Sequence, residues 1–209
     1  MNRSAARWAA GAVLVLLLAI GCTPAGEQTL LFNGQDLSGW VFVLRDKDVD
    51  PMTVWSVRDG VIHCTGEPFG YMRTEADYAD YKLHVEWRWP DEAGNSGVFL
   101  HMSLPDTVWP RSIECQLMSG NAGDFVTFQG VRFKELVEDR VLKKKTESSE
   151  KAPGQWNSYD ITCHGDTIRV SVNGVLQNEA TETTISSGKI CLQSEGKPIE
   201  FRNIYVEPL

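Results

Sequence analysis

Side chains able to bind or transform a ligand are concentrated between Gly94 and Phe125. Two apolar runs, SGVFLHM and SIECQLM, carry some of them, and the adjoining loops carry the others. The members of this group are Asn95, His101, Trp109, Arg111, Glu114, Gln116 and Asp124. A strand pair that only supports a sheet does not need so many groups of these kinds, so we expect any chemistry to occur here.

Alternation places several of these groups on a common face. Within SIECQLM, one apolar residue separates Glu114 from Gln116, and the two-residue period of a strand puts both on the same side. In SGVFLHM the same count puts His101 opposite the apolar Val98. If the strands pair with apolar faces aligned, His101 and Glu114 face one open surface and could transfer protons. The alternative is an outer face that is polar only because it meets water.

A divalent metal ion is compatible with the sequence, although no spacing motif requires one. His101 and Glu114 could be ligands if their side chains converge. Asp46, Asp48 and Asp50 resemble part of a calcium loop, but the glycine and the closing glutamate of an EF-hand are missing. A solvated loop is therefore favoured there, and no metal ligand is assigned.

The first 21 residues have the form of an export signal. Two arginines precede an apolar run from Trp8 to Ile20, which is too short for a comfortable membrane span. The run leads into LAIGC, which is typical of a lipoprotein signal cleaved before Cys22, where a lipid would be attached. The alternative is an ordinary secretory cleavage near Ala25. We expect an exported protein, lipid-anchored in the bacterial envelope, in the periplasm or at the outer membrane.

The remaining chain has the size and charge of an acidic globular protein. With residues 1–21 as the signal and 22–28 as a tether, residues 29–209 suit one domain with a substantial core. Losing two arginines with the signal takes the net charge from −8 to −10. That charge argues against nucleic acid as a partner and against membrane contact except through a lipid anchor. The oligomeric state is not predicted.

Short alternating runs separated by turn residues indicate an all-β fold. Asp59-Gly60 and Asn173-Gly174 are typical hairpin turns, and Leu83 to Trp89 alternates cleanly between apolar and polar residues. No long amphipathic helix pattern is present. The segment from Thr127 to Gln155, with its run of lysines, is interpreted as a long surface excursion. These features favour an antiparallel β-sandwich or jelly roll.

Two further observations concern the later part of the chain. Gln193 and Glu195 fall on one face of a predicted strand, and Arg202 lies near a predicted bulge, so these three could form a second wall facing Glu114. The cysteines Cys64, Cys115, Cys163 and Cys191 lie in or beside apolar strand patterns without a CxxC spacing. Buried free thiols and two disulfide bridges both remain open for them.

The order of landmarks along the chain resembles that of the 3-keto-disaccharide hydrolase family. The landmarks are LFNGQDLSGW, WSVRDGVI, NSGVFLH, IECQL, GQWNSYDI, VNGV and GKICLQSEGKPIEFRNI. They span roughly Leu30 to Leu209. The resemblance implies a concanavalin-like jelly-roll sandwich of two curved antiparallel sheets, a concave face that receives sugar, and an exported carbohydrate-degrading role. Glu114 and Gln116 match the family's Glu-x-Gln pair, whereas Ser119 or the later Asp124 stands where the family has an Asp.

The resemblance implies a small oxidised sugar or glycoside as substrate. A ketone at C3 acidifies the proton at C2, so abstraction of that proton can expel the group at C1 before water adds back. This route needs a base, an acid and a group or metal that stabilises the enediolate oxygen. Glu114 and His101 are the candidate base and acid, in either order, and Arg111 could polarise the ketone or hold a hydroxyl.

The other candidates suit the binding of a sugar. Asn95, Gln116 and Gln193 can bond hydroxyl groups, with Asp124, Glu195 and Arg202 as further contacts. Trp109 could stack on a pyranose ring, although a tryptophan plugging the end of the sandwich is an equal alternative, and Asn95 also suits an ordinary turn. Two rival functions remain, namely a non-catalytic carbohydrate-binding module of the same fold and a lipoprotein that docks another protein.

Overall fold

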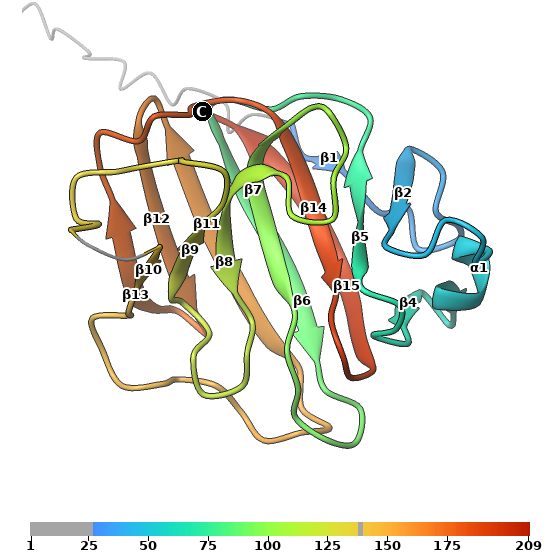
Figure 1. Cartoon of the computed structure of the whole chain (residues 1–209). Coiled ribbons are helices and arrows are strands. Elements are labelled where there is room, and N and C mark those ends of the chain that lie inside the picture. The colour runs from blue at the N-terminus through green and yellow to red at the C-terminus, as the bar shows by residue number, and fades with distance from the viewer. Residues whose placement is uncertain (1–26, 138–139) are drawn as a thin grey trace, which may run out of the picture.

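The computed structural model describes residues 27–137 and 140–209, and nearly all of their regular structure is β-strand. Two antiparallel sheets lie face to face, as Figure 1 shows. The predicted signal sequence and the predicted lipid attachment at Cys22 lie outside the described residues. No helix in the described ranges is long and apolar enough to cross a membrane.

Sheet A has eight strands. In spatial order it contains β13 (Val175–Ala180), β12 (Thr167–Val172), β11 (Asn157–His164), β6 (Tyr81–Arg88), β15 (Ile199–Pro208), β4 (Val61–Cys64) and β3 (Trp55–Arg58), with β1 (Thr29–Leu30) also paired to β15. The central strand β6 places Leu83, Val85 and Trp87 in the interior and its charged residues outside, which confirms the predicted alternation.

Sheet B has seven strands and carries the candidate site. In spatial order it contains β10 (Val141–Leu142), β9 (Phe125–Thr127), β8 (Arg111–Gln116), β7 (Gly97–Ser103), β14 (Lys189–Ser194), β5 (Gly70–Thr74) and β2 (Trp40–Leu44). Apolar residues on alternate positions, such as Ile113 and Leu192, pack against sheet A in the interior. A second, smaller apolar cluster that includes Phe99 and Phe128 covers part of the opposite, outer face of sheet B.

The predicted turns and acidic loop are explained by local hydrogen bonding and by backbone conformation. Asp59 and Asn173 both adopt positive φ, at 52° and 50°, as the tight hairpins between neighbouring strands require. The Asp50 carboxylate accepts a hydrogen bond of 3.0 Å from the Met52 amide and so caps α1 (Pro51–Val54). Asp46 closes a turn by accepting from the Asp48 amide at 3.0 Å. The acidic loop is therefore ordered by its own backbone.

The segment predicted as a surface excursion contributes to sheet B. Within it, β10 pairs with β9, and Val141 lies opposite Val126. No sequence pattern predicts this pairing, because β10 is only two residues long and follows charged residues. The prediction of a plain surface loop is therefore wrong for residues 141–142.

The cysteines, left open by the sequence, are free thiols. Cys64, Cys115, Cys163 and Cys191 are all buried, and none forms a disulfide. Burial raises the pKa of Cys64 to about 11 and that of Cys163 to about 12. Cys64, Cys115 and Cys163 pack as small apolar residues in the core between the sheets, and Cys191 packs in the outer-face cluster of sheet B.

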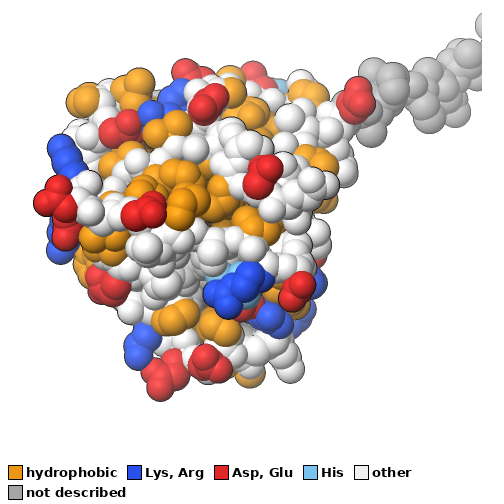
Figure 2. Space-filling view, turned by 90° about the vertical axis from the view of Figure 1, so that its right-hand side faces the viewer, with side chains coloured by type: hydrophobic (Ala, Val, Ile, Leu, Met, Phe, Trp, Pro, Cys, Tyr) orange, Lys and Arg blue, Asp and Glu red, His pale blue; other side chains and the backbone are white. Residues whose placement is uncertain are grey.

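The edge of the molecule beside β2 and α1 carries a group of hydrophobic side chains. Figure 2 shows them gathered across the middle of this face, with acidic side chains around them. Phe42, Val43, Val49 and Pro51 line a shallow hollow of about 320 Å³ at this edge.

Burial between the sheets predicts a large difference between two leucines. Leu192→Ala removes a fully buried side chain from β14, and the cavity should lower the free energy of unfolding by about 2–5 kcal/mol. Leu176→Ala is the matched control, because Leu176 is 51% exposed, and it should change stability by about 0.5 kcal/mol or less. Urea unfolding measures both, and equal losses would contradict the assignment of Leu192 to the core.

Candidate active site

A cleft of about 610 Å³ opens on the outer face of sheet B. The predicted residues that line it are Asn95, Trp109, Glu114, Gln116, Asp124 and Glu195. The lining residues that were not predicted are Met118, Asn121, Val126, Phe128, Arg140, Val141 and Lys143. The cleft therefore draws on strands β8, β9 and β10 and on the loops that follow β8 and β14.

Glu114 is a buried acid at the floor of this cleft. Its neighbours Ile113 and Cys115 enter the core, so alternation directs the Glu114 side chain to the outer face, as predicted. Glu114 is only 2% exposed, and its Oε1 atom has no hydrogen-bond partner among the described residues. Burial, and secondarily the negative charge of Glu195, raise the pKa of Glu114 well above its usual range, while Arg140 opposes the shift.

A glycine on the neighbouring strand makes room for this carboxyl group. Gly97 lies opposite Gln116 in the register between β7 and β8, and the Glu114 side chain lies across it. A Cβ atom at position 97 would be 2.1 Å from Oε1 of Glu114 and 2.7 Å from its Cδ, which are impossible contacts. The position of the carboxyl group therefore depends on the absence of a side chain at Gly97.

Glu195 and its neighbours form the predicted second wall. Burial raises the pKa of the half-buried Glu195, and the amide of Gln193 and the charges of Arg140 and Arg45 oppose this shift. Asn95 makes backbone bridges to Glu195 and to the residue after it, so the loop before β7 lies beside the end of β14. The sequence correctly predicted that Gln193 and Glu195 lie on the same side of the sheet as Glu114.

Several buried polar atoms in this wall are without partners. Asn95 Oδ1 and both side-chain amide atoms of Gln193 are buried, and none meets hydrogen-bond geometry with a described residue, although Gln193 is close enough to Glu195 to lower its pKa. Unpaired buried polar atoms cost free energy unless a ligand or water satisfies them. Of these two residues only Asn95 lines the cleft, and its buried oxygen favours a ligand that can donate a hydrogen bond, such as a hydroxyl group.

Aromatic rings form another part of the cleft. The rings of Trp109 and Phe128 stack with centroids 5.6 Å apart and planes at 18°, and Phe69 meets Trp109 edge-on at 6.3 Å. The Arg140 guanidinium lies 5.5 Å from the centre of the Phe128 ring. Trp109 packs with the outer-face cluster of sheet B, so the alternative of a plug between the sheets is excluded.

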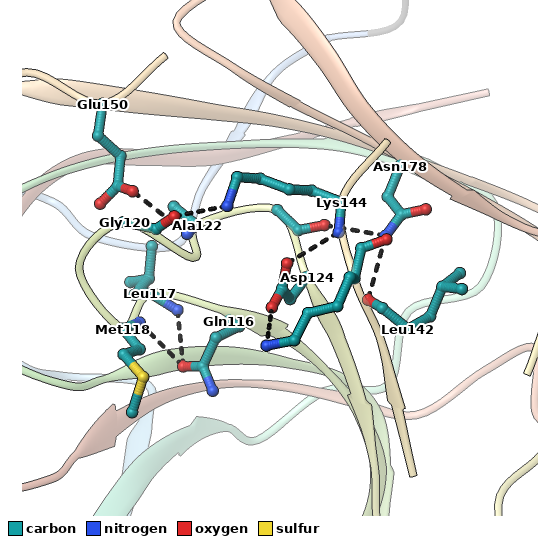
Figure 3. Close-up of polar contacts among 12 residues, drawn as sticks. Gln116, Leu117, Met118, Gly120, Ala122, Asp124, Leu142, Lys144, Glu150 and Asn178 are labelled. Atoms are coloured by element: carbon teal, nitrogen blue, oxygen red, sulfur yellow. Dashed lines mark hydrogen bonds and ion pairs between the residues drawn. The ribbon is translucent and has the colours of Figure 1, made fainter. Parts of the chain in front are cut away.

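Asp124 holds the edge strand β10 at the side of the cleft. Figure 3 shows its carboxylate accepting from Lys143 Nζ at 2.9 Å and from the Lys144 amide at 2.8 Å. Asn178 donates to the carbonyls of Leu142 at 3.3 Å and of Lys143 at 3.2 Å. Asp124 was predicted to contact substrate, and although it lines the cleft, both of its oxygens are occupied by the chain that carries β10.

Gln116 is also partly occupied by its own loop. Its Oε1 accepts from the amides of Leu117 at 3.0 Å and Met118 at 2.9 Å, as Figure 3 shows. The side-chain nitrogen is the group left to donate to a ligand. The predicted location of Gln116 in the site is therefore confirmed, with donation as its available chemistry.

The prediction that His101 shares a face with Glu114 is wrong. A bulge between Leu100 and Ser103 interrupts the alternation, and His101 adopts a positive φ of 53°. Its fully buried ring meets Tyr81 of sheet A edge-on at 5.8 Å, so it points between the sheets. Burial lowers the pKa of His101, and backbone groups of Ile185 and Ala79 only partly oppose this. His101 cannot act with Glu114 as an acid–base or metal-binding pair in this arrangement.

The two predicted arginines also lie elsewhere. Arg111 lies two residues before Ile113 on β8, so alternation places its side chain on the side of the strand opposite to Glu114. It does not line the cleft. Arg202 lies on the outer face of sheet A, where its Nε donates to Glu86 at 2.6 Å and its guanidinium lies 4.0 Å from the centre of the Trp156 ring. The predicted bulge beside Arg202 is confirmed. It lies in β15 of sheet A, on which Arg202 faces away from the site.

Arg140 is the cation that acts on the two carboxyl groups of the site, and no sequence pattern identified it. The charge of Arg140 lowers the pKa of both Glu114 and Glu195, so it lies near both carboxyl groups. Its backbone carbonyl accepts from the Thr127 amide at 2.8 Å, which fixes it beside β9. No periodic pattern surrounds Arg140, whereas Phe128 could have been assigned to the face of Val126 by counting two residues along the strand.

The donor set does not supply the predicted metal pair. Among the described residues, no group of three or more His, Cys, Asp or Glu side chains converges as metal ligands. Glu114 and Glu195 line the same cleft, but Arg140 lines it with them and His101 does not.

The burial of Glu114 predicts a pH-dependent cost to the fold. A carboxyl group whose pKa is higher in the folded protein favours folding below its unfolded pKa, and this stability is lost as pH rises through the folded pKa. Glu114→Gln removes the cost, so the variant should be more stable than the parent at pH 8, and the difference should shrink towards pH 4. Urea unfolding at several pH values tests this. A parent protein at least as stable as Glu114→Gln at pH 8 would contradict it.

The chain is similar in sequence and in structure to known proteins. A family model described as a 3-keto-alpha-glucoside-1,2-lyase-like domain matches residues 27–207. A protein from Parabacteroides distasonis ATCC 8503, described as a "putative glycosyl hydrolase", is 24% identical, with a TM-score of 0.66 over 88% of this chain and 94% of that one. A search of curated protein sequences found no match.

More distant structures share the fold. The Bacillus licheniformis beta-glucanase is 13% identical, with a TM-score of 0.61 over 90% of this chain and 99% of that one. The carbohydrate binding module CBM66 from Bacillus subtilis is 12% identical, with a TM-score of 0.60 over 81% of this chain and 95% of that one. The predicted concanavalin-like jelly roll of two antiparallel sheets is therefore confirmed.

Proposed function

Because the chain belongs to the family of 3-keto-alpha-glucoside-1,2-lyase-like domains, we propose that it cleaves 3-keto-disaccharides or 3-keto-glycosides at the glycosidic bond. The family and the shared fold support a glycosidase-like, carbohydrate-active protein. The observation that carries the finer proposal is the pairing of two carboxyl groups in different surroundings, Glu114 and Glu195, beside Arg140.

The two carboxyl groups suit opposite roles. Glu114 is fully buried, which favours its protonated form and suits a general acid. Burial raises the pKa of Glu195 as well, but Glu195 is only half-buried and Gln193, Arg140 and Arg45 oppose the shift, so Glu195 ionises more readily than Glu114 and suits a general base. This assignment replaces His101 by Glu195. It predicts that the rate falls at low pH as Glu195 is protonated and at high pH as Glu114 ionises.

The proposed reaction is an elimination. Glu195 takes the proton from C2, and the C2–H electron pair forms the enolate of the C3 ketone, whose negative oxygen the Arg140 guanidinium stabilises. The enolate then reforms the ketone, a C1=C2 double bond appears, and the C1–O bond breaks as Glu114 protonates the leaving oxygen. Addition of water across C1=C2 completes hydrolysis, and release of the unsaturated sugar before this step gives a lyase outcome.

Replacing Glu114 tests the catalytic assignment. Glu114→Gln should lower kcat on a 3-keto-glucoside by about 10²–10⁴-fold, because the leaving oxygen loses its proton donor, while substrate binding is retained. Glu92→Gln is the control, since Glu92 pairs only with Lys197 at the surface. Product formation is followed by NMR, which also separates hydrated from unsaturated product. A near-normal rate for Glu114→Gln would remove Glu114 from the mechanism, and binding without turnover by the parent protein would favour the carbohydrate-binding module.

Replacing Gly97 tests the position of the same carboxyl group. Gly97→Ala should reduce kcat at least tenfold, because the new Cβ displaces the Glu114 carboxyl group. Glu114→Asp shortens the side chain and should relieve this contact. We therefore expect the double variant Gly97→Ala/Glu114→Asp to be more active than the product of the two single effects. Strict additivity in steady-state kinetics would show that Gly97 does not act through Glu114.

A further inference from the structure

The cleft has two chemically different halves that meet at Glu114. In one direction lie Gly97 and Gln116, with Asn95 and Glu195 beyond them. In the other direction, Phe99 lies directly opposite Glu114, and the Trp109–Phe128 stack follows. The first is called the polar half and the second the aromatic half.

The polar half suits a sugar ring. A pyranose presents several hydroxyl groups, each of which needs a partner when it leaves water. Asn95 Oδ1 is buried in this half without a hydrogen-bond partner among the described residues, and Gln116 can donate from its side-chain nitrogen. The 3-keto ring therefore belongs beside Glu195, within reach of the base.

The aromatic half suits a group with little hydrogen-bonding capacity. Its lining comprises the rings of Trp109 and Phe128 and the side chains of Val126 and Val141, with Arg140 as the cation beside them. The ring of Phe99 packs against the ring of Phe128, at a centroid distance of 5.7 Å. A second sugar ring would find few partners for its hydroxyl groups there, whereas a flat ring could stack on a surface that is already rigid.

The position of the acid connects the two halves. General-acid protonation requires the leaving oxygen to lie at Glu114, which is the boundary. With the 3-keto ring in the polar half, the group bonded to that oxygen must extend over the aromatic half. We propose that the leaving group is an aromatic ring, bound over Trp109 and Phe128. This inference rests on the proposed function and names the class of glycoside that the site cleaves.

Three synthetic 3-keto-glucosides of the anomer that is turned over test this proposal. Their leaving groups are benzyl, cyclohexylmethyl and methyl alcohol. The first two resemble each other in size and both depart as primary alcohols after protonation by Glu114, so their comparison separates the effect of the flat ring from that of leaving-group acidity. We expect kcat/KM for the benzyl glucoside to exceed that for the cyclohexylmethyl glucoside by about threefold to tenfold, which is the size of an aromatic stacking contact.

Variants at the stack locate the effect. Trp109→Leu should bring the benzyl-to-cyclohexylmethyl ratio close to one, and Trp109→Phe should retain most of it. Tyr205→Leu is the matched control, because it removes an aromatic ring that stacks on His84 on the outer face of sheet A, and it should leave the ratio unchanged.

The outcomes separate this inference from the proposed function. Turnover of all three substrates without preference for benzyl overturns the aromatic leaving group and leaves the proposed function standing. A preference that survives Trp109→Leu also overturns it. Absence of turnover of all three by the parent protein overturns the proposed function itself.

Discussion

The site depends on the burial of one carboxyl group on the outer face of sheet B. Removing a charged carboxylate from water costs several kcal/mol unless partners compensate, and Glu114 has an oxygen without a partner among the described residues. The many apolar residues buried between the two sheets stabilise the fold and offset this cost. The same cost keeps a proton on Glu114, so the destabilising feature of the fold is also the feature that suits it to acid catalysis.

The site also depends on polar contacts that hold the short edge strand β10 in place. β10 is too short to stay on the sheet through its own ladder, and Asp124 and Asn178 supply the additional hydrogen bonds. Together they hold residues 140–144 beside β9, at the side of the cleft. An acid expected to contact substrate thus serves the site by fixing the segment that brings the guanidinium of Arg140 to Glu114 and Glu195.

Sequence alone predicted those parts of the site that follow from regular alternation. Glu114, Gln116, Gln193 and Glu195 all point where a period of two places them, and the two-sheet fold followed from the turns between short strands. His101 was misplaced because one extra residue in β7 reverses the alternation, and nothing in SGVFLHM marks that bulge. Arg140 was missed for a different reason, because its place depends on pairing with β9 and on contacts from distant residues, which no local pattern reveals.

The four buried thiols have a consequence for the conditions that the protein tolerates. Thiol–disulfide exchange and oxidation both proceed through the thiolate, and burial raises the pKa of Cys64, Cys115, Cys163 and Cys191. Little thiolate is therefore present, and an oxidant has little access to it. These four thiols are therefore expected to react slowly with oxidants as long as the domain stays folded.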